Sequence, residues 1–115
     1  MNIEEIREFC LGMPGAEEDV KWGADLTFCV GKKMFAVTGM EMSAESGITV
    51  KTTPEKFAEL TERPGIRPAH YVARYHWVTV EDLSVMTSEE LKDLIQNSYK
   101  LVFDKLPKKE REKIV

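Results

Sequence analysis

The feature that most constrains the fold is a series of short stretches in which apolar and polar side chains alternate. Residues 26–30 read Leu, Thr, Phe, Cys, Val, the period-two pattern of a half-buried strand. A Gly-Lys-Lys tip at 31–33 predicts a hairpin that returns through residues 34–38. Residues 48–51 predict a third strand and residues 75–80 a further one. These strands follow one another closely, which favours antiparallel pairing.

Helix-capping signatures occur before, between and after these predicted strands. A polar cap residue, a proline at the first helical position or a capping box marks the start of each predicted helix. Asn2 with Glu5 predicts the start of a helix over residues 3–11. Thr53 with Pro54 predicts the start of a second helix, which segment 63–68 ends. Thr87 with Glu90 predicts the start of a third helix, which Pro107 ends. The order of elements predicts an α+β fold, a compact antiparallel sheet with helices packed on one side in a two-layer sandwich.

Length and composition indicate one soluble domain over residues 1–115. The chain is 43% hydrophobic and 31% charged, an ordinary globular balance. Its apolar runs are far shorter than the roughly 20 residues that span a bilayer, and its acidic N-terminus does not resemble a signal peptide. We therefore expect a cytoplasmic protein with no membrane partner, in which the two cysteines stay reduced.

The charge is unevenly distributed. The net charge of −4 argues against general, charge-driven coating of DNA or anionic membranes. Residues 1–30 contain seven acids against two bases, whereas residues 63–80 contain three arginines and two histidines and no acid. The sequence therefore allows a local basic surface on an acidic protein.

Several phrases of the sequence match a known family. They are Met13-Pro14-Gly15-Ala16-Glu17-Glu18, Lys21-Trp22-Gly23, Val30-Gly31-Lys32-Lys33-Met34-Phe35-Ala36, Lys51-Thr52-Thr53-Pro54-Glu55, Gly65-Ile66-Arg67-Pro68-Ala69, Trp77-Val78, Leu94-Ile95-Gln96-Asn97-Ser98-Tyr99, Leu101-Val102 and Leu106-Pro107-Lys108-Lys109. Together they resemble the MmcQ/YjbR family of small bacterial proteins, over nearly the whole chain and in the same order. The resemblance implies a fold similar to the CyaY (frataxin-like) sandwich and a proposed "double wing" arrangement for binding DNA. It supplies no catalytic residue.

Under this resemblance, a DNA-binding surface needs cations for phosphates and aromatic faces for bases. The predicted hairpin tip at residues 31–33 is one candidate wing, and the basic segment 63–80 supplies most of the other candidate DNA contacts. The predicted nucleic-acid contacts are Lys32, Lys33, Lys51, Arg67, His70, Arg74 and His76. The competing interpretation places Trp77 in the core and the lysines on an ordinary solvated face.

A second hypothesis is a binding domain with no nucleic-acid role. It would hold a small molecule or a protein partner against the sheet around Tyr71, Tyr75 and Trp77. Strand alternation places Tyr75 and Trp77 on the opposite face from Val78, and either face could carry the ligand. A flat, basic face would favour DNA, whereas a closed pocket would favour a small molecule.

Catalysis and metal binding have little support in the sequence. No nucleophile-elbow, phosphate-loop or dinucleotide motif is present. Cys10 lies on an apolar helical stripe, where a buried thiol is expected, and Cys29 lies on a strand opposite Phe28, where it could be more accessible. His70 and His76 lack a metal-ligand spacing. We expect no enzyme activity, no metal and no cofactor.

Two features near the C-terminus have plain structural interpretations. Ser98 interrupts the apolar stripe of the last long helix, where a small residue allows close approach to the sheet while its hydroxyl bonds back to a helix carbonyl. The basic residues of the tail are expected to be an ordinary charged helix end. They are Lys105, Lys108, Lys109, Arg111 and Lys113.

Overall fold

The computed structural model describes residues 2–21, 25–39, 47–69 and 75–114. Within these ranges, six antiparallel strands form one sheet in the order β1-β2-β3-β4-β6-β5. The strands are β1 (Ala16–Lys21), β2 (Asp25–Val30), β3 (Lys33–Gly39), β4 (Ile48–Lys51), β5 (Ile66–Pro68) and β6 (Trp77–Val80). The helices are α1 (Ile3–Leu11), α2 (Pro54–Leu60), the 3₁₀ turn η2 (Leu83–Val85), α3 (Ser88–Phe103) and α4 (Lys108–Ile114). The predicted α+β class is confirmed.

The predicted helix starts are confirmed by their hydrogen bonds. Asn2 and Glu5 form a reciprocal capping box at the start of α1, and Thr87 and Glu90 form another at the start of α3. The Thr53 hydroxyl accepts a bond from the Lys56 N–H at the start of α2. Each cap satisfies a backbone donor that the first helical turn leaves unpaired.

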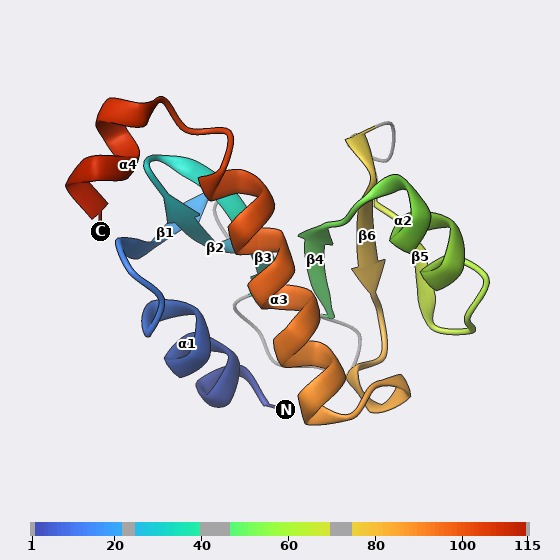
Figure 1. The fold of residues 1–115 in the computed structure, drawn as a ribbon. Helices are drawn as coiled ribbons and strands as arrows, with labels where there is room; N and C mark the ends of the chain where they lie inside the picture. Colours follow the sequence, from blue (N-terminus) through green and yellow to red (C-terminus); the bar gives the residue numbers. More distant parts are fainter. Residues whose placement is uncertain (1, 22–24, 40–46, 70–74, 115) are drawn as a thin grey trace.

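The helices lie on one side of the sheet, and α3 crosses β3 and β4 near its centre (Figure 1). Cross-strand pairs such as Ala36–Val50, Val50–Val78 and Ile48–Val80 place small and β-branched side chains under the helices. Phe28 and Phe35 are fully buried there against the apolar stripe of α3. Burial of such side chains supplies most of the driving force for this packing.

The structure contains two strands that the sequence did not predict. β1 carries consecutive acids on the outer edge of the sheet, where its side chains from Glu17 to Val20 are exposed and no alternation is required. β5 occupies the other edge, within segment 63–68, for which the sequence predicted the end of a helix and no strand. Charges and proline are typical of sheet edges, where one row of backbone groups needs no partner.

The last strand is shorter than predicted. β6 begins at Trp77, because His76 has a positive φ of 67°, which is incompatible with a regular strand. Within β6 the predicted alternation holds: Val78 and Val80 join the core under the helices, and Thr79 bonds to Thr49 through a hydroxyl–hydroxyl contact of 2.8 Å. In the part of the chain that the structure describes, no helix is long and apolar enough to cross a membrane.

Candidate functional site

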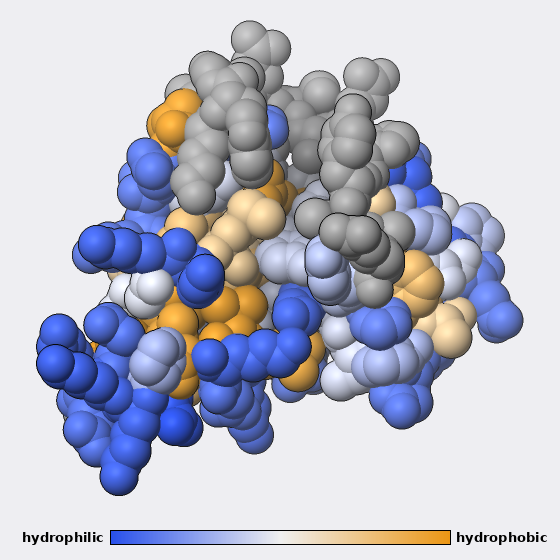
Figure 2. Space-filling model, turned by 90° about the horizontal axis from the view of Figure 1, so that it is seen from above, coloured by the Kyte–Doolittle hydropathy of each residue, from blue (hydrophilic) through white to orange (hydrophobic). Residues whose placement is uncertain are grey.

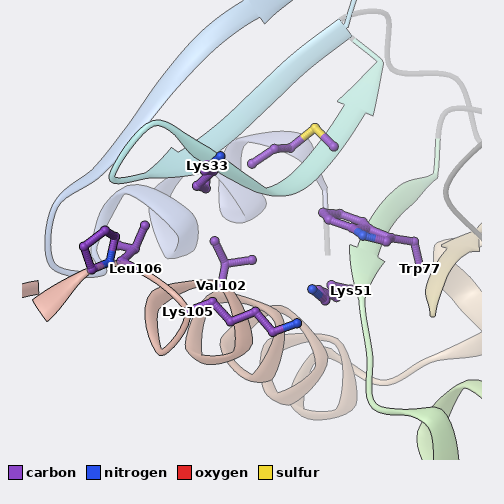
Figure 3. Close-up of a pocket in the computed structure, with 8 residues that line it drawn as sticks. Lys33, Lys51, Trp77, Val102, Lys105 and Leu106 are labelled. Atoms are coloured by element: carbon purple, nitrogen blue, oxygen red, sulfur yellow. The ribbon is translucent and has the colours of Figure 1, made fainter. Parts of the chain in front are cut away.

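A groove of about 370 Å³ lies where β3 and β4 meet the C-terminal end of α3 (Figure 3). Its walls come from four elements, β3, β4, β6 and α3, and from the turn that follows α3. The lining residues are Lys33, Met34, Lys51, Trp77, Val102, Lys105, Leu106 and Pro107. The groove thus combines an apolar floor with three lysines.

Ser98 separates the two central strands at this point. The register that pairs Ala36 with Val50 would place Phe35 opposite Lys51. The Ser98 hydroxyl lies between them: it donates to the Phe35 carbonyl at 2.6 Å and accepts from the Lys51 N–H at 2.9 Å. The Ser98 hydroxyl of α3 therefore takes the place of a direct backbone hydrogen bond between Lys51 and Phe35, and β3 and β4 separate beside the groove.

The expected role of Ser98 was therefore only partly right. The residue is fully buried and sits in the helix–sheet contact, but its hydroxyl bonds to two strands and not back to a helix carbonyl. Because both strand groups would otherwise be buried without partners, the hydroxyl is structurally necessary.

The β2–β3 hairpin tip is held against the turn after α3. Gly31 and Lys32 both have positive φ, 56° and 66°, as in a tight hairpin turn. A Cβ atom on Gly31 would lie 2.7 Å from Leu106 Cδ1, so a larger residue would have to displace the Leu106 side chain as well as adopt a positive φ. The contact fixes Lys32 at the tip and Lys33 on the wall of the groove.

Trp77 is held in place by the residues before and opposite it. The His76 carbonyl accepts bonds from both the N–H and the hydroxyl of Thr52, at 2.8 and 2.6 Å. The His76 ring contacts Phe57 edge to face. Trp77 pairs directly with Lys51 across β4 and β6, so the two side chains project from the same face of the sheet.

The three groove lysines have no acidic partner among the residues that the structure describes. Figure 3 shows the side chains of Lys51 and Lys105 reaching toward each other. Burial lowers the pKa of Lys51 below its ordinary value, and the neighbouring Lys105 lowers it further. Like charges held together in partly desolvated surroundings disfavour the charged form. An anion placed between Lys51 and Lys105 would reduce this repulsion.

The surface around the groove has a mixed character. Seen from the end that carries the α3 C-terminus, apolar surface is bordered by hydrophilic side chains (Figure 2). A second hollow of about 380 Å³ shares Lys51 with the groove and includes Lys56 and Lys100, together with the acid Asp104. Lys51 thus stands between two concave regions.

The structure gathers only some of the predicted site residues. Lys33, Lys51 and Trp77 meet in the groove, and Lys32 lies beside it. Arg67, on edge strand β5, is ion-paired with Glu81. His76 packs on Phe57, and Tyr75 is half exposed before β6. His70, Tyr71 and Arg74 lie outside the residues that the structure describes.

The sequence did not identify Lys105 as a site residue. Lys105 follows the C-cap of α3 and lines the groove with Val102 and Leu106, whereas the sequence predicts an ordinary charged helix end. The phrase Leu106-Pro107 was a usable signal, because it ends the helix and turns the chain back over the sheet.

Other chemistry finds little support in the geometry. Burial raises the pKa of the Cys10 thiol to about 12, which leaves it protonated and unreactive at neutral pH. Cys29 is slightly more exposed than Cys10, at 9% against 0%, but both thiols are buried. In the described ranges, no three His, Cys, Asp or Glu side chains gather where they could hold a metal ion.

The architecture is that of a small α+β domain with an open antiparallel sheet. The family model described as YjbR matches residues 11–101, and the chain belongs to this family. It is 29% identical to the uncharacterized protein YjbR of Escherichia coli K12, over all of this chain and 98% of that protein. It is 27% identical to the uncharacterized protein YbdF of Escherichia coli O157:H7, over 96% of this chain and 92% of that one.

Solved structures agree on the fold. The crystal structure of Deinococcus radiodurans protein DR2400, described by its DUF419 domain, superposes with a TM-score of 0.88 at 28% identity, covering 98% of this chain and 87% of that one. A Pseudomonas syringae protein superposes with a TM-score of 0.72 at 23% identity, covering 89% and 99%. At that identity the second match supports the fold alone.

Proposed function

We propose that this YjbR-family protein is a cytoplasmic, non-enzymatic DNA-binding protein whose phosphate contacts centre on the groove. Lys33, Lys51 and Lys105 provide the contacts inside it, and Lys32 adds one from the hairpin tip. The observation that carries the proposal is the convergence of three lysines from three separate elements, without acidic partners among the described residues. Such a cluster on a chain of net charge −4 favours a localised contact with phosphates over general electrostatic coating.

The distribution of ion pairs narrows the proposed surface. Arg63 donates to Glu90 and to the Val85 carbonyl, and Arg67 is paired with Glu81. These two cations of the 63–80 segment are engaged within the fold, so they add less to a DNA-binding surface than their sequence suggests. The proposal therefore moves the centre of binding from that segment to the groove and the hairpin tip.

The test is fluorescence anisotropy with labelled duplex and single-stranded DNA between about 50 and 200 mM salt, where phosphate contacts are most visible. Four contacts predict a log–log salt slope of about −3.6 for duplex and about −2.8 for single strands. Lys51→Gln and Lys105→Gln should each weaken binding and reduce the slope by about 1. Lys92→Gln, on the N-terminal half of α3, removes the same charge away from the groove and serves as the matched control.

The outcomes separate clearly. Binding that falls with salt and responds to the groove variants, but not to Lys92→Gln, supports the proposal. Equal loss in all three variants would mean that binding depends on total charge only. No binding at low salt would reject DNA as the ligand.

The concave shape of the groove favours a second candidate, the binding of a small anionic molecule. A volume of about 370 Å³ falls at the lower end of the range for small-molecule sites. Apolar walls with a few converging polar groups are typical of such sites. This candidate predicts that a small anion raises the melting temperature of the protein, and that the increase disappears in Lys51→Gln.

A further inference from the structure

We infer that the groove recognises a phosphomonoester carried next to an aromatic base, the chemistry shared by a free mononucleotide and the 5′-phosphorylated end of a DNA strand. In this arrangement the phosphate contacts Lys51 and Lys105, with Lys33 completing the cluster, and the base lies against Trp77. The inference deepens the proposed function, because both require that the groove binds phosphate.

The charge of the groove selects the phosphate. A phosphodiester within a strand carries one negative charge, whereas a terminal phosphomonoester carries about −1.5 to −2 at neutral pH and three strong acceptor oxygens. Three lysines line the groove, and the pKa of Lys51 is lowered by burial and further by the neighbouring Lys105. A dianion relieves the repulsion between these two lysines better than a monoanion, because each lysine can face its own oxygen.

The apolar walls select the rest of the ligand. Trp77 and Met34 form one side of the groove, and Val102, Leu106 and Pro107 form the other. Trp77 is only 7% exposed, as the competing interpretation expected, so a base can contact only the exposed part of its indole. Bases stack favourably on aromatic side chains whatever their sequence, because every base has a π-face. An inorganic phosphate would satisfy the lysines but leave these walls in contact with water.

The lining also predicts what is not recognised. Among the described residues that line the groove, the polar side chains are the three lysines and the indole of Trp77. Reading a base edge requires hydrogen-bonding side chains placed against it, and in this arrangement the lysines are engaged by the phosphate. We therefore expect similar affinity for purine and pyrimidine ligands, with differences that follow stacking strength alone.

The size of the groove limits how much of a strand it holds. Its volume suits one nucleotide, and a duplex can present only its backbone phosphates to the lysines, because its stacked bases offer no free face to Trp77. A strand end fits better than a strand interior, because the terminal base is the easiest one to unstack.

The experiment compares four ligands on the intact chain. They are a short single strand with a 5′-phosphate, the same strand with a 5′-hydroxyl, the mononucleotide dAMP and the nucleoside deoxyadenosine. Affinity is measured by anisotropy for the strands and by calorimetry for the small molecules. We expect the 5′-phosphate to increase strand affinity by about tenfold, as for one additional charge-assisted contact, and dAMP to bind where deoxyadenosine does not.

The arms distinguish the possible failures. Equal binding of the two strands, with no binding of dAMP, rejects the inference and leaves the proposed DNA binding intact. Binding of dAMP with no binding of either strand supports the inferred site, identifies its ligand as a free nucleotide and rejects the DNA-binding proposal. No binding of any ligand rejects both.

Two variants assign the effect to the groove. Lys105→Gln changes an exposed side chain after the last turn of α3, so it should fold normally and abolish the 5′-phosphate preference. Lys109→Gln, on the exposed first turn of α4, removes the same charge outside the groove and should preserve the preference. A preference that survives Lys105→Gln would place the phosphate elsewhere and overturn the inference.

Discussion

Two groups of cations in this protein behave differently. Arg7, Arg63 and Arg67 each form an ion pair with an acid on a neighbouring segment, whereas Lys33, Lys51 and Lys105 gather around one groove with no acidic partner among the described residues. The arginine pairs connect elements of the fold, for example α1 to β1 through Arg7 and Glu18. The side chains of these lysines form no ion pair that links two elements of the described structure.

This difference between paired arginines and unpaired lysines distinguishes cations that stabilise the fold from cations that are available to bind a ligand. Arginine forms planar two-pronged contacts that hold segments together, while lysine is a flexible point charge suited to a mobile anion. Cations that are left close together without neutralisation raise the energy of the unliganded fold, and an anionic ligand can lower it again. Substitutions in the groove and on the ion-paired surface should therefore have different effects.

The largest effect is expected at Ser98, whose hydroxyl parts the strands beside the groove. Ser98→Ala leaves the Phe35 carbonyl and the Lys51 N–H buried without partners, since Ser98 is their link. We expect a loss of about 2–4 kcal/mol in the free energy of unfolding, the cost of two unsatisfied buried groups less relaxation. Urea unfolding would measure it, with Ser88→Ala at the exposed start of α3 as the control. A loss below about 0.5 kcal/mol, the range of ordinary surface substitutions, would show that the strands can close without the hydroxyl.

The next effect is expected at Gly31, which fixes the hairpin tip beside the groove. Gly31→Ala places a Cβ atom on a residue with φ of 56° and against Leu106, so we expect destabilisation by about 1–3 kcal/mol. The double variant Gly31→Ala/Leu106→Ala separates the two causes by a double-mutant cycle. If the clash dominates, the double variant is more stable than the sum of the single changes predicts. Strict additivity would assign the cost to the backbone conformation alone.

The sequence could predict the elements whose signals are local. The β2–β3 hairpin follows from the alternation of residues 26–30 before a glycine turn, and the starts of α1 and α3 follow from capping boxes within four residues. Edge strands β1 and β5 escaped prediction because exposed charges and a proline replace the alternation that burial imposes.

The groove was predictable only in part. Lys33, Lys51 and Trp77 could be named as candidates from residue type, but their meeting with Lys105 depends on packing between segments far apart in the chain. Ser98 and Lys51 are 47 positions apart, and their contact leaves no periodic trace in the sequence. A helix residue that bonds to two strands is a tertiary feature, so local patterns assign it to the helix alone.

A smaller effect is expected from breaking an ion pair on the edge of the sheet. Arg67→Gln removes the pair with Glu81, and exposed pairs of this kind contribute about 0–1 kcal/mol to the free energy of unfolding. Because Arg67 is engaged within the fold, we expect DNA affinity to change less than in Lys51→Gln, measured side by side in the anisotropy assay. Equal losses in the two variants would break the distinction between paired and unpaired cations, and would extend the binding surface to β5.

The smallest and most specific effect concerns the ionisation of Lys51. Its pKa is lowered by burial and by Lys105, so the charged form destabilises the fold. This cost is fully present below the folded pKa and fades as the pH rises from there to the higher pKa of the unfolded chain. Lys105→Gln should raise the Lys51 pKa, and so should a bound phosphomonoester, because each change makes the surroundings more favourable to the ammonium.

The NMR titration of the Lys51 side-chain nitrogen measures both shifts directly, with Lys92→Gln as the charge-matched control. Ligand affinity should then fall at high pH as Lys51 loses its proton, and it should fall at a lower pH than an ordinary lysine would allow. A Lys51 pKa that does not respond to Lys105→Gln would mean that the two ammonium groups do not interact. The groove would then contain three independent cations, as on any solvated surface, and the contrast with the paired arginines would lose its physical basis.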